Sequence, residues 1–309
     1  MPLSPLSVTA IIPATSAPST LGKCVAALES CLDPPDEIIV VREPISAGPA
    51  LARNLGAEQA RGDVLLFVDA DVVAHQDAVT RVREAFARDD ALAAVFGSYD
   101  DEPWDPGVVS GFRNLLHHHV HQTSSAQATT FWAGLGAVRR TAFLAVGGFD
   151  AERFRVPSIE DIDLGMRLTA AGADIRLDHR LQGTHLKTWR LGSMLATDFA
   201  RRGVPWVALR LHARSAPATL NLTWRHRASA SLVVLAAVAA ASRRPRLAVT
   251  SASAFIYLNR PLYALLLRKR GVKAAAAGVV LHALHHLTAV AAVLGGIAVY
   301  AHERATRQR

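Results

Sequence analysis

Three short runs of apolar and β-branched residues near the N-terminus constrain the fold of this chain more than any other feature. They are residues 8–13 (VTAIIP), 37–41 (EIIVV) and 64–68 (VLLFV). Continuous apolar runs of this length are typical of strands that are buried on both faces of a parallel sheet. Segments 21–32 and 50–60, between the runs, have the apolar spacing of helices. The pattern predicts an α/β fold that begins as a doubly wound, mostly parallel sheet.

The same alternation continues beyond these three runs. Residues 80–88 have helical spacing, and residues 92–96 form another apolar run that predicts a strand. Segment 100–111 is rich in Asp, Pro and Gly, which predicts a loop. A helix is expected over 112–121 and a late strand over 175–177.

Asp69 and Asp71 follow the third apolar run directly. In open α/β sheets, ligands bind beyond the carboxyl ends of the strands. Two carboxylates that leave a buried strand together repel each other unless a cation lies between them. Oxygen ligands suit Mg²⁺ or Mn²⁺, which can also hold a diphosphate. The alternative interpretation is a turn that happens to carry two acidic residues.

Two further polar clusters come later in the chain. Glu160 and Asp161 precede a helical pattern, where acidic residues either stabilise the helix N-terminus or supply a general base. His185 and Lys187 would point to the same side of an extended segment, and together they would suit a metal-bound diphosphate. A histidine with a purely structural role is the alternative for His185.

Taken in order, these motifs resemble the inverting family 2 glycosyltransferases of GT-A fold. The resemblance runs from residue 8 to about residue 189, and it depends on several motifs occurring in one sequence order. The motifs are the strand ending at Pro13 and the segments 48–57 (GPALARNLGA), 65–72 (LLFVDADV), 134–150 (GLGAVRRTAFLAVGGFD), 160–168 (EDIDLGMRL) and 184–189 (THLKTW).

On the nucleotide side, the resemblance implies that Pro13 and Ala14 border the base. Arg53 would line the nucleotide pocket, and Asn54 beside it would brace its helix. The family usually has an acidic residue just after the second strand, in a D-[DG]-x-S type turn. This chain has Val-Arg-Glu-Pro at 41–44 instead, so Glu43 is the candidate substitute.

For the metal and the chemistry, the resemblance implies roles for the acidic residues already singled out. Asp71 would coordinate Mn²⁺ or Mg²⁺, Asp69 would contact the metal or the donor ribose, and His185 would contact the metal or the diphosphate. Lys187 would assist in binding the nucleotide-sugar.

For the acceptor side, the resemblance makes Asp161 the general base, with Glu160 beside it orienting the acceptor. The turn 147–150 (GGFD) would shape the acceptor side. The implied activity is a metal-dependent, inverting transfer of a sugar from a nucleotide-sugar to an acceptor hydroxyl.

Two other patterns have a plain structural interpretation. The four histidines within 117–121 (HHHVH) would spread around a short helix, so a solvated or interfacial face is expected and a metal cluster is not. Residues 134–136 (GLG) are too short for a phosphate-binding loop and are expected to form a tight turn.

The net charge is +8, and arginine clusters stand beside apolar stretches at 225–227, 243–246 and 268–270. Basic residues placed in this way suit a membrane surface, and we expect no nucleic acid partner. Residues 274–300 carry no formal charge and are long enough to span a bilayer.

Segments 228–242 and 247–267 are shorter and apolar, so they form either a spanning hairpin or an interfacial element. A buried helical subdomain is the alternative to membrane insertion. We expect a GT-A domain over 1–217 and a helical, membrane-associated region over 218–309.

Residues 1–7 lack the basic and apolar regions of a signal peptide, so a cytoplasmic catalytic domain at the cell membrane is expected. The acceptor would be a lipid or an envelope glycan. Two other functions remain open at this point. One is a nucleotidyltransferase, which also uses paired carboxylates, and the other is a membrane scaffold that binds nucleotide-sugars without turnover.

Overall fold

The computed structural model describes residues 6–212 and 223–307. The chain divides into two compact units. The sheet unit contains residues up to 104 together with 121–187, and the helical unit contains 105–120 and 188–309. The domain boundary expected at residue 217 lies outside the described residues.

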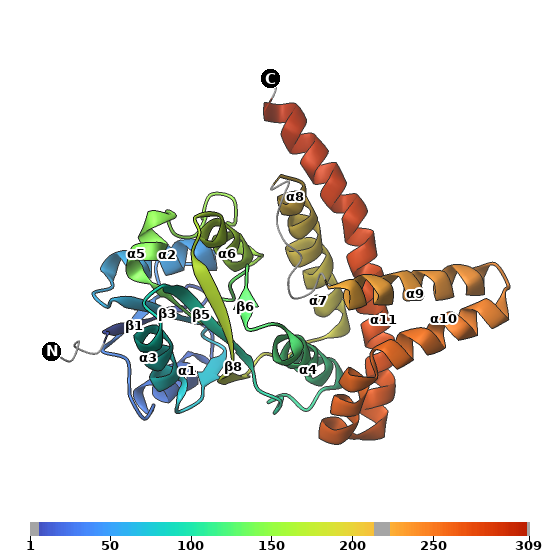
Figure 1. The fold of residues 1–309 in the computed structure, drawn as a ribbon, viewed down its shortest axis with the longest axis horizontal. Helices are drawn as coiled ribbons and strands as arrows, with labels where there is room; N and C mark the ends of the chain where they lie inside the picture. The colour runs from blue at the N-terminus through green and yellow to red at the C-terminus, as the bar shows by residue number, and fades with distance from the viewer. Residues whose placement is uncertain (1–5, 213–222, 308–309) are drawn as a thin grey trace. The chain divides into compact units, whose positions relative to one another are not determined.

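The sheet unit is built around one eight-stranded sheet with the order β2-β1-β3-β7-β5-β8-β4, and β6 pairs with β8 (Figure 1). The strands are β1 (Val8–Pro13), β2 (Glu37–Val41), β3 (Val64–Val68), β4 (Val72–Ala74), β5 (Leu92–Tyr99), β6 (Gln127–Ala128), β7 (Leu135–Arg139) and β8 (Asp174–His185). The helices are α1 (Leu21–Glu29), α2 (Pro49–Gln59), α3 (Ala78–Arg88), α5 (Arg140–Ala145) and α6 (Glu160–Ala170).

The α/β class predicted from the sequence is confirmed, but the sheet is mixed. Strands β1, β2 and β3 are parallel to one another, as expected. Strand β7 enters between β3 and β5 and runs antiparallel to both. Strands β5 and β8 are again parallel, so the sheet beyond β3 contains both parallel and antiparallel pairs.

The strand β7 also corrects the expected tight turn at 134–136, because Leu135 and Gly136 lie within this central strand. The glycine is needed there: a Cβ on Gly136 would lie 2.3 Å from the Trp132 carbonyl oxygen. Glycine weakens the sequence signal of a strand, which explains why the run was interpreted as a turn.

Both faces of the sheet are covered, which explains why β3 is completely buried. On one face, Val64 and Leu66 pack with Cys24 of α1 and Phe86 of α3. On the other, Phe67 packs against the rings of α5 and of the turn that follows it, with ring centroids 5.4 and 5.2 Å away. The apolar run thus directs its side chains alternately into two cores.

The helical unit has its own apolar core, formed by Phe112, Leu262, Leu266 and neighbouring side chains. Its elements are most of α4 (Val108–Thr123), α7 (Leu191–Ala196), the π-helix η1 (Thr197–Gly203), α8 (Val204–His212), α9 (Trp224–Ala241), α10 (Pro245–Leu258) and α11 (Arg260–Arg307).

The C-terminal helix α11 contains the expected apolar run 274–300. It is broken near its start by Gly271, which has φ 80° and ψ 178°. Of the residues that the structure describes, only those of α11 form a helix long and apolar enough to cross a membrane. Its most apolar 18-residue window has a mean hydropathy of 1.7, and 28% of that window is buried.

Candidate active site

The turn between β3 and β4 carries Asp69 and Asp71. The Asp69 N–H donates to the Gly134 carbonyl at 3.1 Å, and the Val72 N–H donates to the Asp69 carbonyl at 2.9 Å. The carboxylates of Asp69 and Asp71 stay 31% and 27% exposed. Because backbone hydrogen bonds hold the turn, both acidic side chains are presented to solvent at this edge of the sheet.

Strand register brings His185 beside Asp71. β8 pairs with β4 so that His185 opposes Val72, and the Leu186 N–H donates to the Asp71 carbonyl at 2.8 Å. Nε2 of His185 lies 3.5 Å from Oδ2 of Asp71. Burial alone would raise the pKa of Asp71, but the hydrogen bond with His185 and the neighbouring charges, including that of Lys187, outweigh burial and hold the pKa below its usual value. The Asp71 side chain is therefore a carboxylate at neutral pH.

Tyr99, at the end of β5, fixes the plane of the His185 ring. The two rings are stacked, with centroids 4.0 Å apart and an interplanar angle of 7°. Trp132 packs edge-on against Tyr99, at a centroid distance of 4.9 Å. Sequence reasoning missed both aromatic residues. The available signal was that Tyr99 ends an apolar run directly before two aspartates.

Arg53 connects the two acidic clusters. This arginine of α2 is 4% exposed. Its Nη2 lies 2.6 Å from Oδ1 of Asp69, and its Nη1 lies 3.0 Å from Oε1 of Glu160. Glu160 is itself 5% exposed, and its other oxygen accepts the Ser158 N–H at 2.9 Å. One guanidinium group thus joins the end of β3 to the start of α6.

Asp161 is positioned by a close approach between α6 and the segment before β7. A Cβ on Gly165 would lie 2.2 Å from the Phe131 nitrogen, so only glycine lets the helix come this near. Because of this approach, the Ala133 N–H donates a hydrogen bond to Oδ2 of Asp161, at a distance of 3.2 Å. Because every residue except proline has a backbone N–H, the sequence does not predict that Ala133 is a hydrogen-bond donor to Asp161.

The environment of Asp161 suits a proton acceptor. Burial and the neighbouring Glu160 carboxylate raise the pKa of Asp161 to about 6, although Arg53 opposes the shift. A general base works best when its pKa lies near the working pH. Asp161 therefore combines a fixed position with a pKa that allows it to take up and release a proton near neutrality.

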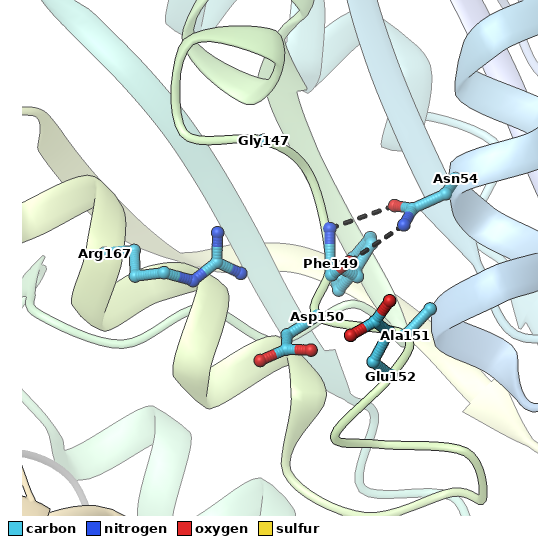
Figure 2. Close-up of a pocket in the computed structure, with 7 residues that line it drawn as sticks. All are labelled: Asn54, Gly147, Phe149, Asp150, Ala151, Glu152 and Arg167. Atoms are coloured by element: carbon cyan, nitrogen blue, oxygen red, sulfur yellow. Dashed lines mark hydrogen bonds between the residues drawn. The ribbon is translucent and has the colours of Figure 1, made fainter.

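The predicted bracing role of Asn54 matches the contacts of its amide group (Figure 2). Its Nδ2 donates to the Phe149 carbonyl at 2.8 Å, and its Oδ1 accepts the Phe149 N–H at 2.9 Å. These bonds tie α2 to the 147–150 turn beside an open pocket of about 410 Å³. The pocket is lined by Asn54, Gly147, Phe149, Asp150, Ala151, Glu152 and Arg167.

The residues expected on the nucleotide side lie at the ends of β1 and β2. The Ala14 N–H donates to the Val41 carbonyl at 2.8 Å, which extends the pairing of these strands beyond Pro13. Glu43 is exposed, and its Oε2 accepts the Ile45 N–H at 3.0 Å within its own turn. Among the contacts of the described residues, none links Glu43 to the Arg53 network.

The donor atoms around Asp71 suit a hard divalent cation. Carboxylate oxygens from Asp69 and Asp71 and the imidazole of His185 are ligands that Mn²⁺ accepts. Oδ1 of Asp69 is shared with Arg53, and Asp71 has one oxygen near His185. Within the described residues, no three side chains already converge on one point as a complete metal site.

The histidine cluster at 117–121 differs from its expected solvated face at its last member. His121 is 6% exposed, and its Nδ1 lies 2.9 Å from the Gly97 carbonyl oxygen. Its ring also packs against Trp132, with centroids 5.6 Å apart. His121 therefore supports the aromatic stack next to the site.

We predict that Arg53→Leu lowers the free energy of unfolding by about 3 kcal/mol, because it leaves the Asp69 and Glu160 carboxylates facing each other without their shared cation. Arg88→Leu is a matched control, since it breaks an exposed pair with Glu84 and should cost below about 1 kcal/mol. Urea unfolding followed by tryptophan fluorescence measures both. Equal losses for the two variants would show that the buried network adds no stability.

Comparison with known proteins places these features in a family context. Residues 16–146 match the family described as Glycosyl transferase family 2. The chain is 29% identical over 173 residues to the Pre-mycofactocin glycosyltransferase of Mycobacterium tuberculosis, in two strains. That match covers 50% of this chain and 34% of the relative, so the chain spans about a third of the length of these curated relatives.

Among solved structures, the chain is similar to the mannosyltransferase PcManGT from Pyrobaculum calidifontis in complex with GDP-Man and Mn²⁺. The TM-score is 0.57 at 15% sequence identity, and the match covers 96% of this chain and 88% of the other. At this identity the likeness concerns the fold, and it confirms the GT-A architecture expected from the sequence.

Proposed function

We propose that this chain, which carries a glycosyltransferase family 2 domain, transfers a sugar from a nucleotide-sugar donor to an acceptor hydroxyl with inversion. The observation that carries the proposal is the Arg53 bridge. It joins the acidic turn after β3 to the start of α6, and its two ends, Arg53 and Glu160, are 107 positions apart in the chain. The bridge supports a single site in which one side would bind the diphosphate and the other would accept the proton.

On the donor side, Asp71, Asp69 and His185 would hold Mn²⁺ or Mg²⁺. When bound, the metal neutralises charge on the diphosphate leaving group. Lys187, whose charge already acts on Asp71, would add a second cation for the same phosphates. Pro13 and Ala14 at the end of β1 would border the base, with Glu43 near the ribose. The solved neighbour holds GDP-Man with Mn²⁺, so this pair is the first donor to test.

On the acceptor side, Asp161 would take the proton from the attacking hydroxyl. That hydroxyl has a pKa far above neutral, so it attacks efficiently only if a base removes the proton as the new bond forms. Glu160 is engaged by Arg53 and by the Ser158 N–H, which leaves it a positioning role. The oxygens of Asp161 accept the backbone N–H groups of Ala133 and Ile162, whereas Glu160 is ion-paired with Arg53. This difference favours Asp161 as the base.

The acceptor is proposed to be a lipid or an envelope glycan at the cell membrane, with the catalytic domain on the cytoplasmic side. Support comes from the long apolar helix α11 and from the basic residues beside the apolar segments. A membrane-attached enzyme reaches an acceptor that does not leave the bilayer.

A product-release assay tests this function against its two rivals. The protein is incubated with GDP-mannose and a panel of other nucleotide-sugars in the presence of Mn²⁺. Release of nucleoside diphosphate supports sugar transfer, and release of pyrophosphate supports a nucleotidyltransferase. Binding of a nucleotide-sugar without any release would support the scaffold and contradict the proposed activity.

The pKa of Asp161 leads to a pH prediction. The base works only when ionised, so turnover should rise as pH increases through about 6 and at pH 5 should be about a tenth of its maximum. Turnover measured at saturating donor from pH 5 to 8 gives the profile. The residual activity of Asp161→Asn should lack this step. A wild-type profile that is flat over the same range would contradict the assignment.

A further inference from the structure

The helical unit has an unusual distribution of charge. Residues 199–302 contain fourteen Lys and Arg residues and no Asp or Glu. Cations along this stretch therefore have no acidic side chain within it as a partner. An excess of positive charge of this kind attracts anionic partners. The hairpin formed by α9 and α10 contains five of these cations.

Helices α9 and α10 form a hairpin (Figure 1), and many of its large apolar side chains are exposed. Its buried residues are Ser229, Val233, Ala239, Ser251 and Phe255. In contrast, Val238 and Val249 are 56% and 64% exposed. Other large apolar side chains exposed on the hairpin are Leu235, Leu247, Ile256 and Tyr257.

This arrangement suits an apolar environment outside the hairpin. A helix that faces water normally carries charged residues on its outer face. Segments 228–242 and 247–259 carry none. Large apolar side chains on an outer face without charges are typical of helices that contact the acyl chains of lipids. The outer surfaces of these two segments are therefore suited to contact with acyl chains and not with water.

The end of the hairpin is cationic. Arg243, Arg244 and Arg246 are all exposed there. Arg243 has φ 54°, and the Arg244 N–H donates to the Ala239 carbonyl at 2.8 Å. This helix end is a position where glycine is normally favoured, because other residues are strained in the left-handed region.

The length and the charge of the hairpin decide how it meets a bilayer. At about 1.5 Å per residue, α9 and α10 measure roughly 27 and 21 Å, shorter than a hydrocarbon core of about 30 Å. Three arginines at the tip oppose passage through that core. We propose that the hairpin lies in the membrane interface, with its apolar flanks among the acyl chains and its arginine tip on the phosphates of anionic lipids.

This inference rests on the membrane attachment proposed above and adds the class of lipid. The test uses the full chain with Val249→Cys carrying an environment-sensitive fluorophore. The native Cys24 and Cys31 are buried, which favours labelling at position 249. The labelled protein is placed in nanodiscs of phosphatidylcholine alone, or with phosphatidylglycerol added. The expected result is a blue shift that grows with phosphatidylglycerol and weakens in high salt.

Changing Arg243, Arg244 and Arg246 together to Gln should lower the ratio of docked to undocked hairpin about 100-fold, roughly five-fold for each arginine. Arg243→Gly distinguishes the effect of charge on docking from an effect on folding. This variant should keep or raise the melting temperature, and it should still weaken docking. Arg88→Gln with Arg155→Gln, two exposed arginines of the sheet unit, should leave docking unchanged.

Two results would overturn the inference. One is the same spectrum in neutral and anionic nanodiscs, and the other is an unchanged blue shift in the triple variant. Sugar transfer in detergent is measured separately on each variant. A lipid-dependent spectrum without any transfer activity would leave the hairpin inference standing and refute the proposed function.

Discussion

Asp161→Asn should lower turnover by roughly 10²–10⁴, the usual contribution of a general base, with little change in the affinity for the nucleotide-sugar. Asparagine keeps the size of the side chain, and its amide oxygen can still accept the Ala133 N–H, but it cannot take the proton of the acceptor hydroxyl. Steady-state turnover and calorimetric donor affinity, measured on the same preparation, separate the two effects.

Glu160→Gln is the matched control for this prediction. Glu160 is the neighbouring carboxylate, and its contacts with Arg53 and Ser158 assign it to support and to acceptor binding. Its substitution should lower turnover less than Asp161→Asn does. If Asp161→Asn keeps its turnover and Glu160→Gln loses it, the roles of the two carboxylates are reversed.

Asp71→Asn should remove metal-dependent activity and leave the fold intact. Its carboxylate is ionised and partly exposed in the turn after β3, and its backbone, which bonds Leu186, is unaffected by the substitution. Even the loss of a residue that merely supports a metal ligand costs about 10–100-fold in metal affinity, so loss of a ligand should cost more.

Manganese binding followed by electron paramagnetic resonance tests this prediction without depending on turnover. Asp90→Asn is the control, because the Asp90 side chain is 90% exposed and belongs to no cluster proposed here. Full activity of Asp71→Asn in manganese, with unchanged metal affinity, would refute the assignment.

The parallel half of the sheet was predictable because local sequence determines it. The bounds of β1, β2 and β3 agree with the three apolar runs. Strands β1 and β3 are buried, and β2 at the edge of the sheet is partly buried. All three lie between turn-forming residues, so the apolar pattern and the turn residues both predict strands. Strands β4 and β7 were missed, because β4 has three residues and β7 contains a glycine. Both strands depend on pairing with distant partners.

For the candidate site, the sequence identified the acidic residues but not what holds them. The sequence singles out Asp69, Asp71, Glu160, Asp161 and His185 by residue type and position. Their roles are implied by the family resemblance and remain predictions. The Arg53 bridge and the donation from Ala133 to Asp161 arise only when distant segments meet. The stacking of Tyr99 on His185 has the same origin. Such contacts join residues that are far apart in the sequence, so no local sequence pattern predicts them, and they become visible only in the folded structure.

The irregular pairing of β5 with β8 has a consequence for how the protein tolerates insertions. On β5, Phe96 and Ser98 are two residues apart, yet their partners on β8, Leu177 and Gln182, are five apart. The extra residues of β8 leave the ladder between two segments whose register is fixed separately. A residue inserted among 178–181 can therefore be absorbed there, and His185 keeps its orientation. An insertion between residues 183 and 185 would turn the imidazole to the opposite face of the sheet.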